Sequence, residues 1–200
     1  YSSDLKYAPR YIVTNAQAPS APSSVTVSPS ATWTGENQVT VNWSGVSVGS
    51  GASSLKRLEF STTSATSGFA TISGATSTSG SAKITVPEGK KTVWVRAVNN
   101  YNVVGSAKAS STQFWKDVTA PSVPASVTVS PEDWTNKPIT IIAGNATDSG
   151  SGVAKYQCAI NNSPSTAPAT GAFKDVSAQS MDIKPNEQGK QYVWVRAVDR

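Results

Sequence analysis

The stretch that decides the fold is Val93-Trp94-Val95-Arg96-Ala97-Val98, which returns without a change at residues 193–198. Three further pairs of segments match: Ala18 to Pro29 with Ala120 to Pro131, Trp33-Thr34 with Trp134-Thr135, and Ser50-Gly51 with Ser151-Gly152. These anchors recur in the same order at a spacing of about 100 residues, the signature of an internal repeat. The 200-residue chain is therefore predicted to contain two copies of one structural unit.

Within each copy, apolar and polar residues alternate with a period of two. Val39, Val41 and Trp43 alternate with polar residues, and Ile139 and Ile141 repeat the pattern. Further along, the apolar residues Leu58 and Phe60 alternate with Arg57 and Glu59. The comparable stretch of the second copy has Tyr156, Cys158 and Ile160. Another alternating run contains Val93, Val95 and Ala97. Alternation of this kind marks a strand with one buried face. About seven such strands per copy, without a helical stretch, predict an antiparallel sandwich of two sheets.

The predicted fold class is all-β, with two tandem immunoglobulin-like antiparallel β-sandwiches of about 100 residues each, the second lacking its last strand. Residues 1–17 are interpreted as a segment similar to a last strand followed by a linker, residues 18–117 as the first domain and 118–200 as the second. Two pairs of prolines, Pro19 with Pro22 and Pro121 with Pro124, lie where the copies join. Because proline fixes φ, this joint is expected to be short and stiff.

Composition excludes several kinds of site. The chain has no His, which removes His-based acid–base and nucleophilic catalysis, and the single Cys158 removes internal disulfides and cysteine-bound zinc. No apolar run approaches the roughly 18 residues of a membrane span. The net charge of +5 is scattered, so nucleic acid is not an expected partner. No cofactor and no enzymatic activity are predicted. The chain has no signal-peptide pattern and does not begin with Met, so it is expected to be a mature or excised piece.

Several motifs resemble the tandem bacterial Ig-like or fibronectin type III-like modules of cell-surface or extracellular filament proteins. They are Asp117 to Pro121, Trp134-Thr135-Asn136, Asp148 to Val153 and Tyr192 to Asp199. The resemblance implies a secreted, non-enzymatic structural module of a stalk or filament at the bacterial cell surface. Such modules also serve as carbohydrate- or receptor-binding adhesins, and this alternative stays open.

Two sets of residues are candidates for binding. Trp94, Arg96, Tyr192, Trp194 and Arg196 fall opposite the core phase and would form an aromatic face for surface glycans. The alternative is that Arg and Lys side chains cover the Trp rings, which the identical recurrence favours. For a metal, Asp117 and Asp148 are the calcium candidates, with Glu132, Asp133 and Asp199 as further loop acids. Calcium needs six to eight oxygens, and the first copy has Asn15 and a residue near Val48 instead, so ordinary loop acids are the alternative.

The last expectation concerns assembly. In the first copy, the strand that ends near Val98 is expected to be followed by a loop and then by a final strand over residues 106–116. Residues 1–14 precede the first proline-rich joint just as residues 103–116 precede the second, so they are interpreted as a final strand, with Leu5, Tyr7, Tyr11 and Val13 as its apolar positions. The sequence printed ends two residues after Val198. Residues 5–13 of one molecule are therefore predicted to pair with residues 193–198 of another copy and build a head-to-tail filament. The competing interpretation is a fragment of a longer array of Ig-like repeats.

Overall fold

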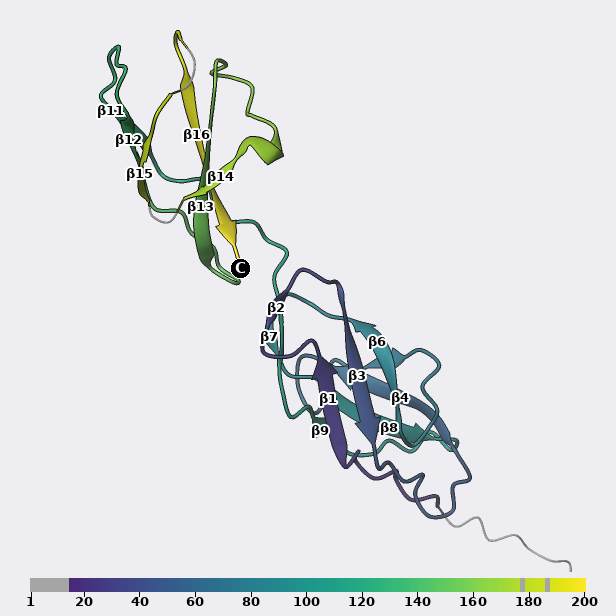
Figure 1. Ribbon diagram of the computed structural model, residues 1–200. Coiled ribbons are helices and arrows are strands. Elements are labelled where there is room, and N and C mark those ends of the chain that lie inside the picture. The colour runs from purple at the N-terminus through teal and green to yellow at the C-terminus, as the bar shows by residue number, and fades with distance from the viewer. Residues whose placement is uncertain (1–14, 177–178, 186–187) are drawn as a thin grey trace, which may run out of the picture. The chain divides into compact units, whose positions relative to one another are not determined.

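A computed structural model describes residues 15–176, 179–185 and 188–200, which form two compact units (Figure 1). The first unit takes in the described residues up to Thr32 together with Asn37–Trp115, and the second takes in Trp33–Glu36 and Lys116–Arg200. Strands make up the regular structure of both, apart from one short 3₁₀ turn. The predicted all-β class, with antiparallel sheets of the immunoglobulin-like kind, is confirmed. No helix among the described residues is long and apolar enough to cross a membrane.

The strands up to residue 116 build the sheets of the first copy. They are β1 (Ser24–Ser28), β2 (Trp33–Thr34), β3 (Gln38–Ser44), β4 (Leu55–Ser61), β5 (Ala70–Ile72), β6 (Gly80–Thr85), β7 (Gly89–Lys91), β8 (Trp94–Asn99), β9 (Lys108–Ala109) and β10 (Phe114–Lys116). One sheet has the order β1-β3-β6 and another the order β5-β4-β8-β9, while the short strands form a third in the order β2-β10-β7.

The core of the first unit lies between the β1-β3-β6 sheet and the β5-β4-β8-β9 sheet. Val39, Val41 and Trp43 of β3 are buried, as the alternation predicted, and they meet buried residues such as Val95 of β8. Trp43 is 5% exposed, and its indole Nε1 donates a hydrogen bond to Ser77 O at 3.0 Å. The expectation that Trp43 is a core residue is therefore confirmed.

The second copy repeats this plan with fewer fully buried side chains. Its strands are β11 (Val127–Ser130), β12 (Ile139–Ala143), β13 (Val153–Asn161), β14 (Lys174–Val176), β15 (Ser180–Ile183) and β16 (Tyr192–Asp199), with the 3₁₀ turn η1 (Thr170–Ala172) before β14. The sheets have the orders β11-β12-β15 and β14-β13-β16. Ile139 and Ile141 are buried residues of β12 in the first of these sheets, and Cys158 is a buried residue of β13 in the second sheet. The turn η1 departs from the expectation of no helical stretch.

The last strand of the first copy differs from its prediction. Residues 106–116 were expected to form one strand, but the structure has two, β9 and β10, in different sheets. Between them, the Ser110 hydroxyl donates to Thr112 O at 2.6 Å and the Ser111 amide donates to Val25 O at 3.0 Å. These bonds turn the chain away from β8, so the single-strand prediction is wrong. The predicted strand with Leu5, Tyr7, Tyr11 and Val13 lies outside the described residues.

The identical six-residue stretch is buried differently in the two units. In β8 and just before it, Val93, Val95 and Ala97 are fully buried, whereas residues 193–198 of β16 are all half-buried. β8 has a neighbour on both edges, β4 and β9, but within the described part of the second unit β16 pairs only with β13. The same sequence therefore loses burial because one neighbouring strand is not beside it.

Candidate functional site

Three carboxylates of the second unit lie together. Asp117 directly follows β10, Asp148 lies in the loop between β12 and β13, and Asp199 ends β16. One carboxylate oxygen of each lies within 4.8 Å of the others. At an effective dielectric constant of about 20, two unit charges at that separation repel by roughly 3 to 4 kcal/mol. The fold thus gathers three like charges that would separate if their loops were free.

Backbone amides hold two of these carboxylates in place. Asp148 Oδ1 accepts hydrogen bonds from the amides of Gly150 at 2.9 Å and Gly152 at 2.7 Å. Asp117 Oδ1 accepts from the Thr119 amide at 3.0 Å, and its Oδ2 accepts from the Ser151 amide at 2.5 Å. A Cβ on Gly150 would lie 2.3 Å from Asp117 Oδ2, so only glycine allows the Asp117 carboxylate to come this close.

The two carboxylates differ in how well their oxygens are satisfied. Asp117 is 8% exposed. Burial raises the pKa of its carboxyl, but hydrogen bonds with Ser151, Thr119 and the Asp148 carboxyl outweigh this effect, so the net pKa lies below the usual value. Asp148 as a whole is half-buried, but its Oδ2 has less than 1 Å² of exposed surface and, among the described residues, accepts no hydrogen bond from a backbone or side-chain N–H or hydroxyl; its nearest polar neighbour is the Asp117 carboxyl. The sequence singled out Asp117 and Asp148, and the structure brings them together with Asp199. Glu132 and Asp133, the other loop acids, are exposed and do not belong to this cluster.

The candidate glycan-binding residues take part in packing within each unit. Arg96 Cζ lies 3.8 Å from the centroid of the Phe69 ring, and Arg196 Cζ lies 4.2 Å from that of Phe173. Trp194 is half-buried and its Nε1 donates to Asn161 Oδ1 at 2.9 Å. The guanidinium groups of both arginines thus stack on phenylalanines, while the covering of Trp94 and Trp194 by Arg and Lys side chains stays a prediction. Near the start of β16, Lys190 Nζ lies 5.5 Å from the centroid of the Tyr192 ring.

Both phenylalanines escaped the sequence analysis for one reason. Phe69 directly precedes β5, and Phe173 directly precedes β14, so they hold equivalent places before equivalent edge strands. Their separation is 173 − 69 = 104 residues, whereas the six-residue repeat has an offset of 100. The loop that leads to the edge strand is longer in the second copy, and a search at a fixed spacing therefore misses the match.

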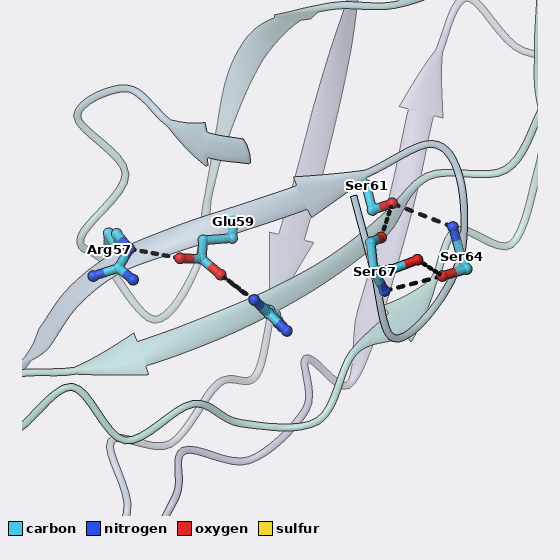
Figure 2. Close-up of polar contacts among 6 residues, drawn as sticks. Arg57, Glu59, Ser61, Ser64 and Ser67 are labelled. Carbon is cyan, nitrogen blue, oxygen red and sulfur yellow. Dashed lines mark hydrogen bonds and ion pairs between the residues drawn. The ribbon is translucent and has the colours of Figure 1, made fainter. Parts of the chain in front are cut away.

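Glu59 joins two arginines on β4 and β8 (Figure 2). Arg57 Nε lies 2.7 Å from Glu59 Oε1, and Arg96 Nε lies 2.8 Å from Glu59 Oε2. Burial raises the pKa of the Glu59 carboxyl, but the hydrogen bonds from Arg96 and Arg57 outweigh it and leave the pKa lowered. The alternation predicted an outward Glu59 and an inward Phe60, whereas Glu59 is 6% exposed and Phe60 half-buried. That prediction is wrong because the paired charge makes burial of Glu59 tolerable.

Gln157 takes the place of Glu59 in the second unit. Glu59 is opposite Arg96 in the register of β4 with β8, and Gln157 is opposite Arg196 in the register of β13 with β16. Arg196 Nε donates to Gln157 Oε1 at 2.8 Å. Both units therefore use an arginine that bonds to the neighbouring strand and stacks on a phenylalanine, and this packing accounts for the recurrence of Arg96 and Arg196.

The loop that follows β4 is closed by serines (Figure 2). The Ser61 hydroxyl donates to Ser67 O at 2.7 Å and accepts the amide of Ser64 at 3.3 Å, and the hydroxyls of Ser64 and Ser67 lie 2.8 Å apart. In the second unit, Asn161 closes the loop that follows β13, since its Nδ2 donates a hydrogen bond to Thr166 O at 2.7 Å. In both units, therefore, a polar residue at the end of the strand (Ser61 in β4, Asn161 in β13) holds the following loop closed.

Cys158 is a buried thiol, as its phase predicted. It is 3% exposed. Burial raises the pKa of the thiol, and the positive charge of Lys174 lowers it by less, so the net pKa lies above the usual value. A thiol that stays protonated at neutral pH is a poor nucleophile. The residue serves the core of the second unit.

Two solved structures align with this chain at low sequence identity, whereas family models and curated proteins do not match it. No protein-family model matches the chain, and a search of curated proteins gave no match. Among solved structures, the FN1–FN3 domains of chicken CNTN1 align with a TM-score of 0.42 and 18% identity over 93% of this chain and 64% of that chain. The chain thus spans less than two thirds of the length of that structure. The fibronectin(III)-like modules of Clostridium thermocellum CbhA align with a TM-score of 0.35 and 20% identity over 88% of this chain and 85% of that chain.

Proposed function

We propose that the chain is a length of non-enzymatic spacer from a bacterial extracellular surface protein, stalk or filament, whose copies join head to tail by strand exchange. The observation that carries the proposal is the outer edge of β16. Its central residues 193–198 repeat residues 93–98 without a change, yet within the described residues it pairs on one edge only. An edge strand with free amides and carbonyls accepts another strand.

The first unit supplies the template for what that edge accepts. The amides of Gly105 and Ser110 donate to the carbonyls of Ala97 and Val93 at 2.8 and 2.7 Å. Between these bonds, β9 pairs with β8 in the register Trp94↔Ala109 and Val95↔Lys108. Ala197 and Val193 are the equivalent residues of the second unit. A strand that follows the same pattern would be expected to bury Val193, Val195, Ala197 and Val198 as their counterparts Val93, Val95, Ala97 and Val98 are buried in the first unit.

Residues 5–13 of a second copy fit this template by sequence. Pro19 matches Pro121 at an offset of 102, and the same offset places Lys6 and Tyr7 opposite Lys108 and Ala109 of β9. The proposal therefore pairs Lys6 with Val195 and Tyr7 with Trp194. Because donor and acceptor lie at different places in the chain, the contact does not close on itself and propagates as a filament. In a longer protein, a segment after Arg200 would compete for the same edge.

Sedimentation velocity over a series of concentrations tests the proposal with three proteins and one matched control. The whole chain is expected to form concentration-dependent chains, and deletion of residues 1–14 is expected to leave monomers. A third protein carries a copy of residues 101–116 directly after Arg200, which supplies the strand from its own chain. It is expected to stay monomeric, while a matched variant with those appended residues in scrambled order continues to associate.

Other outcomes would overturn the proposal. A whole chain that stays monomeric at every concentration, or a deletion variant that associates as strongly as the whole chain, removes strand exchange. Specific binding on a glycan array that Trp94→Ala or Trp194→Ala abolishes would assign the chain to carbohydrate-binding adhesins instead of spacers.

A further inference from the structure

We infer that Asp117, Asp148 and Asp199 bind a calcium ion within the second unit, and that this ion links the segment after β10 to the loop before β13 and to the end of β16. Three observations carry the inference: the carboxylate cluster, an unsatisfied buried oxygen in it, and the different solution that the first unit uses at the same place. The inference depends on the second unit alone and is independent of strand exchange.

The first unit closes the equivalent place with an amide. Asn99 is the counterpart of Asp199 at the offset of 100. Its Nδ2 donates to Gln17 O at 2.9 Å and to Val48 O at 3.3 Å, so one NH₂ group bonds both the segment before Pro19 and the loop before β4. Its Oδ1 accepts the amides of Tyr101 and Val103. Asn99 is fully buried and serves as the link between three parts of the unit.

The second unit replaces that donor with acceptors. Asp199 stands where Asn99 stands, Asp148 where Val48 stands and Asp117 where Asn15 stands. A carboxylate at 199 has no N–H group, so it cannot donate to carbonyl oxygens as the Asn99 amide does. The substitution brings three anions together in the place where the first unit has a hydrogen-bond donor. A cation restores the link, because it attracts all three carboxylates at once.

Asp148 Oδ2 is the oxygen that most needs such a partner. Although the Asp148 side chain as a whole is half-buried, this oxygen has less than 1 Å² exposed and accepts no hydrogen bond from any residue that the structure describes, whereas Asp148 Oδ1 accepts two from backbone amides. A buried carboxylate oxygen without a partner is costly and rare in proteins. The amides fix the orientation of Asp148 and leave Oδ2 as the unused ligand atom of the cluster.

The ligand atoms of the cluster favour calcium over other common cations. Three oxygens that all lie within 4.8 Å of one another share a point no more than about 2.8 Å from each, so a small approach brings all three to the calcium–oxygen bond length of about 2.3 to 2.6 Å. The cluster offers carboxylate oxygens and no sulfur or imidazole, a set that suits a hard cation. Calcium accepts irregular sites with six to eight oxygens, whereas magnesium demands near-octahedral geometry and keeps most of its waters.

The experiment follows the backbone amides by NMR while calcium chloride is added to the whole chain. The amides of Thr119, Gly150, Ser151 and Gly152 donate to the candidate ligands, so their resonances are expected to move together. A dissociation constant of about 0.1 to 1 mM is typical of extracellular modules. With 10 mM calcium, the melting temperature of the second unit is expected to rise by about 5 to 20 °C.

Three variants separate a calcium site from a general charge effect. Asp148→Asn and Asp199→Asn are expected to lose the shift of resonances and of melting temperature. Asp199→Asn should also melt higher than the unchanged chain in EDTA, because it copies Asn99. Asp133→Asn, an exposed acid of the same unit, changes the net charge equally and is expected to keep the full calcium response.

The inference is overturned if calcium leaves the four amides in place, or if sodium chloride at equal ionic strength moves them as far as calcium does. It is also overturned if Asp148→Asn and Asp199→Asn, both shown to be folded by a cooperative melt, respond as the unchanged chain does. An equal response to magnesium at equal concentration would replace calcium selectivity with a general divalent effect and contradict the assignment to calcium.

Discussion

Arg96 stacks on Phe69, with its Cζ 3.8 Å from the ring centroid, although the two residues come from β8 and from the loop that precedes β5. The contact ties the edge strand β5 to the centre of its sheet. A cation–π contact of this kind contributes about 0.5 to 1 kcal/mol. A double-mutant cycle of Arg96→Lys and Phe69→Leu is expected to give a coupling energy in that range. A second double-mutant cycle, of Lys56 with Phe69, is the control. A coupling energy in this control as large as that between Arg96 and Phe69 would contradict the assignment of the coupling to the stacked pair.

Glu59 is expected to be the most sensitive charged residue of the first unit, because its carboxylate accepts hydrogen bonds from two arginines. Hydrogen bonds to charged groups contribute about 1.5 to 3 kcal/mol each, so Glu59→Ala should cost about 3 kcal/mol of unfolding free energy. Glu59→Gln should cost less, since Gln157 shows that an amide oxygen still accepts from the arginine. Urea melts measure both losses. Glu36→Gln, at an exposed position, is the matched control, and an equal cost there would contradict the prediction.

The pH dependence of stability follows from the same carboxyl. The pKa of Glu59 in the folded protein is lower than its ordinary value of 4.5, so the folded state binds the proton more weakly than the unfolded state. Its contribution is complete above the unfolded pKa and is lost as the pH falls through the folded pKa. Urea melts in acid are therefore expected to show a steeper loss in the unchanged protein than in Glu59→Gln. Parallel curves for the two proteins would disprove the role of Glu59.

Trp43 is the largest side chain of the β3 face, and its loss should leave a cavity. Trp43→Ala is expected to cost about 3 to 5 kcal/mol. Trp43→Phe keeps most of the volume but removes the hydrogen bond to Ser77 O, so it should cost less. Denaturant melts give both values, and a loss below about 1 kcal/mol in Trp43→Ala would mean that Trp43 does not support the core.

Cys158 offers a chemical probe for opening of the second unit. Because the thiol is buried and its pKa is raised, it should react with a disulfide reagent far more slowly than free cysteine at neutral pH. The rate is expected to rise with urea in step with unfolding of the second unit, while the first unit carries no thiol to interfere. Rapid reaction of the native protein would show that the β13 face is open.

Sequence alone was sufficient for the fold because local alternation decides which face of a strand is buried. Val39, Val41 and Trp43 show this, since each points into the core as the period of two requires. It was not sufficient where a partner distant in sequence decides burial. Glu59 is buried because Arg57 and Arg96 pair with it. The period of two places Arg57 on the same face as Glu59, but Arg96 comes from β8 and cannot be assigned to Glu59 from spacing on one strand.

The candidate site was predictable in part for a related reason. Asp117 and Asp148 stood out because the first copy differs from the second at their positions, and the fold brings them together with Asp199. Phe69 and Phe173 did not stand out, because loops of different length hide their equivalence. Comparison of repeats therefore finds substitutions in segments whose lengths match between the copies and misses residues placed just beyond a change in loop length.

The exposure of Trp134 has a practical consequence for optical measurements. This indole is 89% exposed in the loop before β12, whereas Trp43 is 5% exposed. A collisional quencher such as acrylamide is therefore expected to quench the fluorescence of Trp134 efficiently and that of Trp43 only weakly. Replacement of Trp134 by Phe would remove the water-relaxed component of the fluorescence spectrum, so that the remaining emission would come from indoles with less access to water.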